Sequence, residues 1–562
     1  MQWTCCDIDA PCLPAICKSS PCPVLTEAFP LPSSDMTVRS HVMHILAVRP
    51  GMPIGALALV AMLQGCASLP PPVAAPVSQA FDRPAETRLG QQVLAAAQSH
   101  AGESGFLILD TGQQAFLQRA ALIEAAERSI DAQYYIWNSD VSGGYLARRL
   151  LLAADRGVRV RLLLDDINVA GRDPVIAALD HHPNIEVRIY NPSAVRSGPG
   201  KWLAFVADFR RMNRRMHNKT FVVDAALGIA GGRNIGDEYF DLHEQVNFRD
   251  RDVLAMGPIV RAMSANFDAY WNSVWSYPIS RLVSAAVNGQ DFAAQLAQAR
   301  TEATDTTGLT HAPVQDAAAA RAAVLQALVN ASWAPAELVF DAPVQDMQAA
   351  ADQPKQTAQA LRRLVEQTDS EILIESAYFI LGADQLDELA GLRARGVRVA
   401  ALTNSLASND LVTNHAGYAR WRPAMLAQGL ELHELRPDAA ACGVWITATN
   451  YCDKGAVSLH AKSAVFDRRT LYIGSFNVNL RSIYLNGETV LIIHSPALAQ
   501  RVAADIETGM APDNSWQVSQ DADGHLHWSS GAGKVWSQEP TVGWWQRFKS
   551  GLFSLLPIEK YL

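Results

Sequence analysis

Residues 216–240 read MHNKTFVVDAALGIAGGRNIGDEYF and hold a histidine, a lysine and an aspartate in the order His-x-Lys-x4-Asp, followed by a glycine pair and an asparagine. The same order returns in LHAKSAVFDRRTLYIGSFNVN at residues 459–479. The offset is constant, since 460 − 217 and 477 − 234 both give 243. One chain therefore carries two copies of one site. The matched pairs are His217 and His460, Lys219 and Lys462, Asp224 and Asp467, Gly231 and Gly474, and Asn234 and Asn477.

The residue types in the repeated pattern suit chemistry at a phosphate ester. An imidazole acts near neutral pH as a nucleophile or a general acid, and Lys and Asn side chains donate hydrogen bonds to anionic oxygens. The residues between Lys and Asp are mostly apolar and β-prone, so each His and Lys, two positions apart, share one face of a strand. Gly231-Gly232 and Gly474-Ser475 are expected to form tight turns that bring the two Asn side chains towards that face.

In such a site one His would attack phosphorus and form a phosphohistidine, while the other protonates the leaving oxygen. The roles would reverse when an alcohol or water attacks. Two Lys and two Asn would stabilise the charge on the equatorial oxygens. The body of the chain contains no Cys/His cluster with zinc spacing. We therefore expect no metal and no other cofactor.

Length and composition narrow the class of protein. A chain of 562 residues is long enough for more than one domain. Its composition, with 49% hydrophobic and 18% charged residues, is typical of a globular protein with sizeable cores. The net charge of −9 argues against nucleic acid as a partner.

The N-terminal segments differ from the rest of the chain. Residues 1–51 are interpreted as an extension from an upstream start codon followed by a basic n-region, with a Cys-rich metal or disulfide knot as the alternative for its beginning. Residues 52–66 combine an apolar run with LQGC, which resembles a bacterial lipobox and predicts a secretory signal with lipidation at Cys66. An uncleaved anchor or an unmodified cysteine is the alternative. Residues 67–87 are Pro-rich and predict a tether.

Helical and strand-like patterns alternate through most of the remaining chain. The first half has helical spacing at 115–129 and a strand-like run at 130–137, and the second half repeats this order with EILIESAYFI at 371–380. The alternation predicts an α/β fold of two homologous domains, each a largely parallel or mixed sheet flanked by helices. The predicted boundaries are 88–283 for the first domain, 284–340 for a helical connector, 341–510 for the second domain and 511–562 for a C-terminal tail.

The paired pattern with its trailing Gly-Gly or Gly-Ser and Asn resembles the signature of the phospholipase D superfamily over residues 89–498. The resemblance implies two phospholipase D-like domains related by a pseudo-twofold, with one active site at their interface. It also implies that His217 is the nucleophile and His460 the acid. The Asp residues at 224 and 467 would serve mainly in packing and hydrogen bonding.

Each histidine of such a site needs a carboxylate that orients its ring. Glu488 follows His460 by 28 residues (488 − 460), a spacing similar to that of superfamily members with a Glu in this role. The matching position in the first copy is Gln245. We therefore choose Asp250 from FRDRDV, which resembles the family segment whose first Asp has this role. Glu244 and Asp252 remain possible.

The two copies also differ behind the first glycine. Ser475 of the second copy stands where the first copy has Gly232, and Glu488 stands where it has Gln245. We include Ser475 among the candidate site residues. The asymmetry predicts a division of labour between the two histidines.

Within the superfamily, RMNRRMHNKTFVVD at 211–224 and the ending LLPIEKYL resemble the bacterial cardiolipin synthases, most closely the C type. The resemblance implies a phosphatidyltransferase that makes cardiolipin from phosphatidylglycerol, with phosphatidylethanolamine as a further candidate donor. Water as acceptor would instead make a phospholipase D. A nuclease of the same superfamily is disfavoured by the acidic charge and the exported N-terminus. An envelope lipoprotein that only binds anionic lipid is the non-enzymatic alternative.

Two segments suggest contact with a membrane surface. Basic and aromatic residues precede the first motif and suit anionic phospholipids, with a solvated basic helix as the alternative. Residues 543–556, GWWQRFKSGLFSLL, predict an amphipathic helix that is either interfacial or docked on the core. The expected location is the bacterial cell envelope, on the outer or inner membrane, and the C-type resemblance adds an accessory protein as a candidate partner. The basic residues are Arg196, Lys201, Arg210, Arg211, Arg214 and Arg215, and the aromatic ones are Trp202, Phe205 and Phe209.

Two cysteines lie just before the second motif. Cys442 and Cys452 would form a disulfide in an exported domain. Free buried thiols are the alternative.

Overall fold

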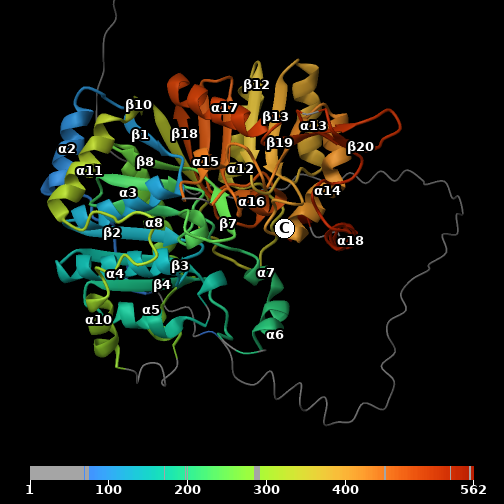
Figure 1. Cartoon of the computed structure of the whole chain (residues 1–562). Helices are drawn as coiled ribbons and strands as arrows, with labels where there is room; N and C mark the ends of the chain where they lie inside the picture. The colour runs from blue at the N-terminus through green and yellow to red at the C-terminus, as the bar shows by residue number, and fades with distance from the viewer. Residues whose placement is uncertain are drawn as a thin grey trace, which may run out of the picture. The chain divides into compact units, whose positions relative to one another are not determined.

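The computed structural model describes Leu69 and residues 75–561, apart from 170, 197, 199, 284–290, 449–450, 532 and 556–558. The predicted extension and n-region (1–51) and the predicted signal with Cys66 lie outside the described residues. The described segments belong to one compact unit. Its strands form two large mixed sheets and one two-stranded sheet (Figure 1).

The first large sheet has nine strands. Its strands β2, β3 and β4 pair in parallel, and all its other neighbouring strands are antiparallel. The order is β10 (Ser332–Ala334), β1 (Ser104–Leu109), β8 (Asp252–Met256), β6 (Leu227–Gly231), β5 (Thr220–Val223), β2 (Ser129–Tyr134), β3 (Arg159–Asp165), β4 (Ile185–Tyr190) and β9 (Ser276–Pro278).

The second large sheet has ten strands and repeats the same topology. Its parallel strands are β12, β13 and β14, and again the other pairs are antiparallel. The order is β11 (Ala336–Phe340), β18 (Thr489–His494), β17 (Thr470–Gly474), β16 (Lys462–Phe466), β12 (Glu371–Ser376), β13 (Arg398–Asn404), β14 (Glu431–Leu435), β19 (Ser515–Gln520), β20 (Leu526–Ser529) and β21 (Val535–Trp536). The two-stranded sheet consists of β7 (Val246–Arg249) and β15 (Ala456–Leu459).

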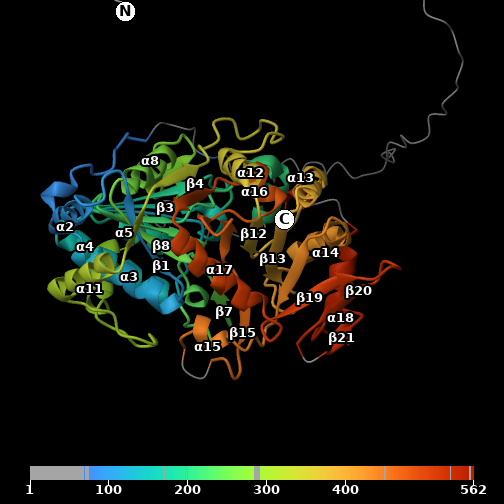
Figure 2. The same ribbon diagram turned by 90° about the horizontal axis from the view of Figure 1, so that it is seen from above.

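Helices flank both sheets, as Figures 1 and 2 show. The helices of the first repeat and the connector are α2 (Arg88–Ala97), α3 (Gly112–Ala125), α4 (Val141–Asp155), α5 (Asp173–Asp180), α6 (Gly200–Ala207), α7 (Phe209–Met212), α8 (Ile259–Trp271), α10 (Phe292–Thr301) and α11 (Ala317–Val329). Those of the second repeat are α12 (Gln356–Gln367), α13 (Ala383–Ala394), α14 (Val412–Ala427), α15 (Cys442–Trp445), α16 (Leu480–Tyr484), α17 (Pro496–Met510) and α18 (Trp544–Phe553). Short 3-10 turns are η1 (Pro84–Glu86), η2 (Asp166–Asn168), η3 (Asp237–Tyr239), η4 (Ile279–Arg281) and η5 (Glu559–Tyr561).

The predicted α/β fold of two homologous halves is confirmed, and the sheets are of the mixed kind. Parallel pairing is limited to the β-α-β units that the alternation predicts, in which α4 joins β2 to β3 and α13 joins β12 to β13. The antiparallel strands are joined by hairpins such as β5–β6 and β16–β17. Parallel neighbours need a crossover, whereas a hairpin of a few residues produces an antiparallel pair.

The two repeats share a hydrophobic core. One cluster contains Val222 and Val253 from the first sheet, Leu373 and Val465 from the second, and residues of α8 and α17. The clusters on the other faces of the sheets belong to one repeat each. Burial of one face of each sheet against the other repeat brings the edges that carry the motifs together.

Several strands cross the boundaries expected from the sequence. The end of the predicted connector supplies β10 to the first sheet and, after Pro335, β11 to the second. The predicted C-terminal tail supplies β19, β20 and β21 to the second sheet. The described part of the predicted tether contacts α8, where the backbone amide of Ala80 donates to the Asp268 carboxylate (2.8 Å).

The predicted amphipathic helix near the C-terminus is α18. It packs against α14 and donates from Gln546 to the Leu406 carbonyl (2.9 Å). Its opposite side exposes Trp544, Trp545 and Phe548. The helix is therefore docked on the second repeat and still presents an apolar face. Among the described helices, none combines the length and apolar character needed to cross a bilayer.

Cys442 and Cys452 form a disulfide with a Cα–Cα distance of 5.9 Å. The sequence left open a disulfide or two free buried thiols, and the structure contains the disulfide. Closing so short a loop stabilises a fold by about 2–3 kcal/mol, chiefly by restricting the unfolded chain.

We predict that Cys442 and Cys452 are linked in protein prepared without reductant, and that the variant Cys442→Ser/Cys452→Ser melts a few degrees lower. Mass spectrometry of the peptides that contain these two cysteines and thermal unfolding measure the two effects. The control is Val329→Ser, an exposed substitution on α11. Two free thiols in the oxidised preparation would contradict the prediction.

Candidate active site

Each histidine lies where the motif strand of its repeat begins, and the backbone there pairs with the other repeat. β7 and β15 pair in parallel, and the His460 amide donates to the Arg249 carbonyl (2.8 Å). On the opposite side of the pseudo-twofold, Met216 pairs with Gly487, whose carbonyl accepts from the His217 amide (2.8 Å). Each motif is therefore positioned by the neighbouring repeat as well as by its own sheet.

The carboxylates that contact the histidines also come from the opposite repeat. His217 Nδ1 lies 2.8 Å from Glu488 Oε2, and His460 Nδ1 lies 2.5 Å from Asp250 Oδ2. The two acidic residues chosen from the sequence are thus next to the rings, but the pairing by spacing within each copy is wrong. The pairing crosses over because the strand ends of the two repeats interdigitate at the interface.

The alternatives for the first-copy carboxylate lie elsewhere. Glu244 and Gln245 are exposed. Asp252 is buried, but its carboxylate pairs with Arg119 (2.9 Å). Among the three acidic candidates of the first copy, only Asp250 reaches a motif histidine.

The contacts determine the tautomer of each imidazole. An ionised carboxylate only accepts hydrogen bonds, so Nδ1 of His217 and of His460 carries the proton. This leaves Nε2 of each ring with a free lone pair. A carboxylate–imidazole pair of this kind fixes the ring and increases the basicity of its far nitrogen.

Gly232 and Ser475 occupy equivalent positions beside the two carboxylates. A Cβ at Gly232 would lie 2.1 Å from Asp250 Oδ1, so only glycine leaves room for that carboxylate. In the second repeat the Ser475 hydroxyl donates to Glu488 Oε2. The asymmetry noted in the sequence therefore gives Glu488 a hydrogen bond that its counterpart Asp250 lacks at this position.

The glycines before these positions are required by close approach of a strand and do not form tight turns, which corrects the sequence-based expectation. Gly231 ends β6 and Gly474 ends β17, and neither has a positive φ. A Cβ at Gly231 would lie 2.2 Å from Asp252 Oδ1, and one at Gly474 would lie 2.2 Å from the Thr489 carbonyl oxygen. The neighbouring strands β8 and β18 pass too near for a side chain.

The two lysines of the motifs are buried next to the histidines. Lys219 Nζ donates to the carbonyl of His217 (2.7 Å), and Lys462 Nζ donates to the carbonyl of His460. Each ammonium retains further N–H groups for a ligand. Two ammonium groups beside two imidazoles make a compact anion site in a water-poor interior.

Burial dominates the ionisation of this cluster. It lowers the pKa of Lys219 to about 7 and that of Lys462 to about 8. It also lowers the pKa of His217 to about 4, against the attraction of Glu488, and that of His460 to about 3, where Lys462 adds to the effect. Both imidazoles of the empty site are therefore neutral at pH 7.

The two carboxylates, unlike the imidazoles, are charged. Burial alone would raise the pKa of Asp250 and of Glu488, but the adjacent imidazoles and ammonium groups outweigh it and hold both pKa values below the usual range. Both groups are ionised at neutral pH. An anion that enters the site would raise the pKa of the histidines and lysines, because it adds a negative charge among them.

Both motif asparagines are buried. Asn234 is buried, accepts from the Ile136 amide (3.1 Å) and donates to the Tyr239 hydroxyl (2.9 Å). Asn477 is buried as well, and its side-chain oxygen is unpartnered among the described residues. The Asn234 amide is therefore held by two hydrogen bonds, whereas the Asn477 oxygen has none among the described residues.

The aspartates of the motifs do not reach the site. Asp224 and Asp467 have left-handed φ values of 54° and 49° and close the β5–β6 and β16–β17 hairpins, at the ends of β5 and β16 away from the histidines. The Asp224 carboxylate accepts from the amides of residues 127–129, and that of Asp467 from the amides of residues 369–371. They join each hairpin to the strand beside it.

Aromatic rings that the sequence analysis did not assign to the site surround the histidines. Tyr135 lies 4.9 Å from the His217 ring, between ring centroids, and Tyr239 and Phe248 lie 5.1 and 5.0 Å from His460. Tyr239 is within the repeated stretch and Phe248 is two positions before Asp250, so their proximity to motif residues was the available signal. These rings limit the access of water to the cluster.

Most of the basic run before the first motif is internal, which corrects its interpretation as a membrane-facing charge. Four of its residues form contacts with other described residues of the fold, whereas Lys201 is half-buried and Arg210 is exposed. The exposed residues here are the apolar ones on α6 and α7: Trp202, Leu203, Val206 and Phe209. The internal partners are Asp166 and Asp173 for Arg196, Asp208 for Arg211, the Ala349 carbonyl for Arg214, and Asp165 for Arg215.

A family model described as "Cardiolipin synthase, PLD-like domain" matches the chain twice, at residues 120–271 and 361–509. Each match contains one copy of the His-x-Lys-x4-Asp pattern. Together the matches cover more than half of the 562 residues.

Known proteins resemble the chain over most of its length. Cardiolipin synthase C of Escherichia coli (strain K12) is 37% identical over 479 residues, which are 84% of this chain and 99% of that protein. The major cardiolipin synthase ClsA of Bacillus subtilis (strain 168) is 23% identical over 398 residues, 71% of this chain and 67% of that protein. A crystal structure of phosphatidylserine synthase from Haemophilus influenzae Rd KW20 has a TM-score of 0.52 at 14% identity, covers 84% of this chain and 100% of its own, and is similar in fold.

The lowered histidine pKa values predict acid sensitivity of the empty protein. Unfolded histidines have a pKa of 6.5, above the folded values of about 4 and 3, so the unfolded chain binds more protons once the pH falls below 6.5. The histidine contribution to stability is complete above pH 6.5 and is lost as the pH falls towards 4 and 3. We expect His460→Asn to show a smaller fall in Tm between neutral and mildly acidic pH than the wild type.

Thermal unfolding over a pH series without lipid measures this effect. His494→Asn is the matched control, because His494 is exposed at the end of β18. The control should follow the wild type. Equal pH dependence of His460→Asn and the wild type would refute the assignment of His460 as a buried neutral base.

Proposed function

The chain belongs to the cardiolipin synthase family of phospholipase D-like proteins, and on this basis we propose that it is a phosphatidyltransferase that forms cardiolipin from phosphatidylglycerol through a phosphohistidine. One observation carries the proposal: two neutral imidazoles, each held at Nδ1 by a carboxylate of the other repeat, share a buried site with two lysines. The site has two bases and two lysines that donate hydrogen bonds to an anion, the components of phosphoryl displacement at a diester.

In the first step, Nε2 of one histidine attacks phosphorus of the donor lipid. A P–N bond forms, the P–O bond to the headgroup alcohol breaks, and the second histidine supplies a proton to the leaving oxygen. The bound phosphate anion is what allows this second imidazole to hold a proton at neutral pH, because it counteracts the burial that lowers the pKa. Lys219 and Lys462 stabilise the charge on the non-bridging oxygens.

In the second step, the histidine that gave its proton removes one from the acceptor hydroxyl. The acceptor oxygen attacks phosphorus, the P–N bond breaks and the free imidazole returns. With the terminal hydroxyl of a second phosphatidylglycerol as acceptor, the products are cardiolipin and glycerol. Phosphatidylethanolamine as donor would release ethanolamine in the first step.

We assign the nucleophile to His217 and the acid to His460. The support is the environment of Glu488, which also accepts from Ser475 and Ser482 and is thereby fixed as the partner of His217. A firmly oriented ring suits the covalent role. Asp250 lies against the backbone of Gly232 and orients His460 for proton transfer.

Water as the acceptor would produce phosphatidic acid, so a phospholipase D is the second candidate function. The observation that favours transfer is the ring of aromatic side chains around the histidines, which restricts water. A nuclease is the least favoured alternative, because the net charge is −9 and most of the basic run is internally paired.

We further propose that the protein acts on the surface of an envelope membrane. The support is a pair of exposed apolar segments: Trp202 on α6 and Trp544 on α18 are 74% and 72% exposed. Tyr561 contacts Phe209 of α7 with ring centroids 4.8 Å apart, so the C-terminal residues adjoin the α6–α7 segment. Lipidation at Cys66 would supply a second anchor, and two anchors give stable attachment where one is marginal. An accessory protein remains a candidate partner.

Incubation of the purified protein with labelled phosphatidylglycerol, with and without phosphatidylethanolamine, followed by lipid mass spectrometry, tests the function. Cardiolipin with release of glycerol is the expected result. Phosphatidic acid alone would establish the phospholipase, and turnover of DNA without turnover of lipid would establish the nuclease.

Substitutions of the two histidines are predicted to block different steps of the reaction. With phosphatidylglycerol labelled at phosphorus, His217→Asn should form no covalent adduct, while His460→Asn should retain an acid-labile adduct and lose about 10²–10⁴-fold in turnover, the usual contribution of a general acid. Denaturing gels at neutral and acidic pH detect the adduct. His494→Asn serves as the control with wild-type labelling. Labelling of His217→Asn and not of His460→Asn would reverse the assigned roles.

The exposed tryptophans are predicted to contribute to membrane binding. In a Cys66→Ser background, which removes the acylated residue, Trp202→Ser/Trp544→Ser should bind phosphatidylglycerol vesicles at least about tenfold more weakly, because two large apolar side chains no longer enter the interface. Vesicle co-sedimentation measures the change. Val329→Ser, equally exposed on α11, is the control. Unchanged binding of the double variant would rule out these helices as the contact.

A further inference from the structure

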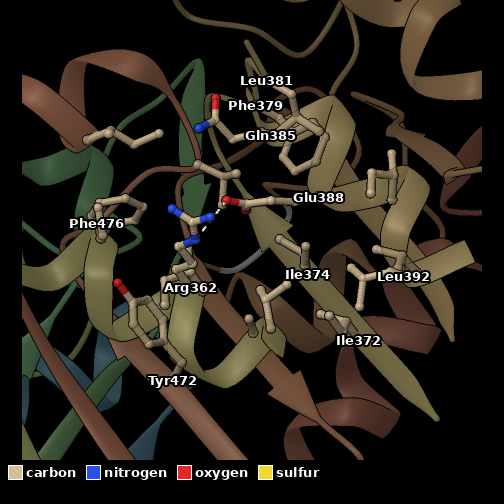
Figure 3. Close-up of a pocket in the computed structure, with 18 of the residues that line it drawn as sticks. Arg362, Ile372, Ile374, Phe379, Leu381, Gln385, Glu388, Leu392, Tyr472 and Phe476 are labelled. Atoms are coloured by element: carbon tan, nitrogen blue, oxygen red, sulfur yellow. Dashed lines mark ion pairs between the residues drawn. The ribbon is translucent and has the colours of Figure 1, made fainter. Parts of the chain in front are cut away.

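The second repeat contains an apolar cavity beneath α12 and α13. Its volume is about 180 Å³, and Figure 3 shows its lining of aliphatic and aromatic side chains, among them Ile372, Ile374, Phe379 and Leu392. The floor is the central part of the sheet, β12 and β16. Apolar cavities of this kind stay dry and accept apolar ligands.

The first repeat provides an internal comparison. In its sheet, Ala132 of β2 pairs with Phe221 of β5, whereas in the second sheet Ile374 of β12 pairs with Ala464 of β16. Ala464 is the counterpart of Phe221, since 464 − 221 is again 243. Phe221 is completely buried in the core of its repeat, and Ala464 lines the cavity. The second repeat thus has a methyl group where the first has a ring, although Ile374 is larger than its counterpart Ala132, and Ala464 leaves its part of the sheet face open to the cavity.

The helices that cover this face of the sheet also leave it more open in the second repeat than in the first. In the first repeat, α3 and α4 are joined by a buried ion pair between Glu124 and Arg149 (2.6 Å). In the second, Arg362 of α12 and Glu388 of α13 form a pair (3.2 Å) whose members are 60% and 29% exposed. Figure 3 shows this pair at the edge of the cavity. Ile374, on a central strand of the sheet, is consequently only partly buried.

The inner end of the cavity adjoins the candidate active site. Lys462 lines the cavity and also donates to the His460 carbonyl, so one residue belongs to both sites. Phe476, next to Asn477 of the second motif, lines it as well. An apolar chain in the cavity would therefore extend from the region where the phosphate is held.

We propose that this cavity binds the distal part of one acyl chain of the phospholipid whose phosphate occupies the paired-histidine site. The proposal rests on the proposed function and adds a chain-length specificity to it. A cavity of about 150 Å³ accommodates benzene, so the present one holds roughly seven chain carbons. The ion pair lies at the exposed edge of the cavity, whereas the interior is lined by apolar side chains that suit a hydrocarbon.

The test fills the cavity with the side chain that the first repeat already uses. For Ala464→Phe we expect the ratio of kcat/KM for dioleoyl- over dihexanoyl-phosphatidylglycerol to fall at least about tenfold relative to the wild type, because a chain that short does not reach the cavity. Ala401→Leu is the matched control: Ala401 lies on the same sheet, its counterpart by strand register is Leu162, and it does not line the cavity. Its ratio should equal that of the wild type.

A second measurement does not depend on turnover or on the folding of Ala464→Phe. Phosphatidylglycerol with a photoreactive group at the end of one acyl chain is cross-linked to His217→Asn protein, in which the lipid stays intact. We expect labelled peptides from residues 356–394, and loss of this label when unlabelled dioleoyl-phosphatidylglycerol competes.

The outcomes separate this inference from the proposed function. Labelling only of residues that do not line the cavity, or an unchanged chain-length ratio in a folded Ala464→Phe, overturns the acyl-chain site while cardiolipin formation by the wild type still stands. Competition by free oleate and not by phosphatidylglycerol also overturns it, because the occupant would then be a fatty acid unrelated to the substrate. Absence of lipid turnover in the wild type contradicts the proposed function, whereas the cross-linking still reports on the cavity.

Discussion

The ion-paired contacts between the repeats are the constraint on which the rest of the structure depends. Neither repeat contains a complete histidine–carboxylate pair: Glu488 belongs to His217 and Asp250 to His460. The backbone reinforces the exchange, since each motif strand begins by pairing with the other repeat. In a half-chain each imidazole would lose its carboxylate, and the sheet face that packs against the other repeat would be exposed to water. The shared core between the sheets is therefore as much a requirement of the site as of stability.

The second constraint is the burial of several ionisable groups in one dry site. Burial lowers the pKa values of two lysines and two histidines, and an anion that enters the site would raise them again. The two ionised carboxylates balance the charge of the two ammonium groups, and the lysines keep N–H donors for a ligand. Binding of a phosphodiester and the protonation of one imidazole are thereby coupled, so the ligand itself helps to establish the acid–base state that the transfer needs.

Duplication has left the two halves with different tasks. Glycine beside Asp250 and serine beside Glu488 give the two carboxylates different hydrogen bonds. The interiors differ as well, with Phe221 filling the first repeat and Ala464 leaving a cavity of about 180 Å³ in the second.

The sequence by itself determined the two-repeat α/β fold and the local identity of the motif residues, because a constant offset of 243 and the periods of strands and helices are properties of short segments. It also singled out Asp250 and Glu488. Only the tertiary structure decided which histidine each of them contacts, because the exchange takes place between strand ends 210 and 271 residues apart. The same holds for the arginines before the first motif, whose partners lie on other elements, and for Gly231 and Gly474, where a neighbouring strand excludes a side chain. Spacing along the chain predicts local geometry, whereas contacts across an interface depend on how whole sheets pack.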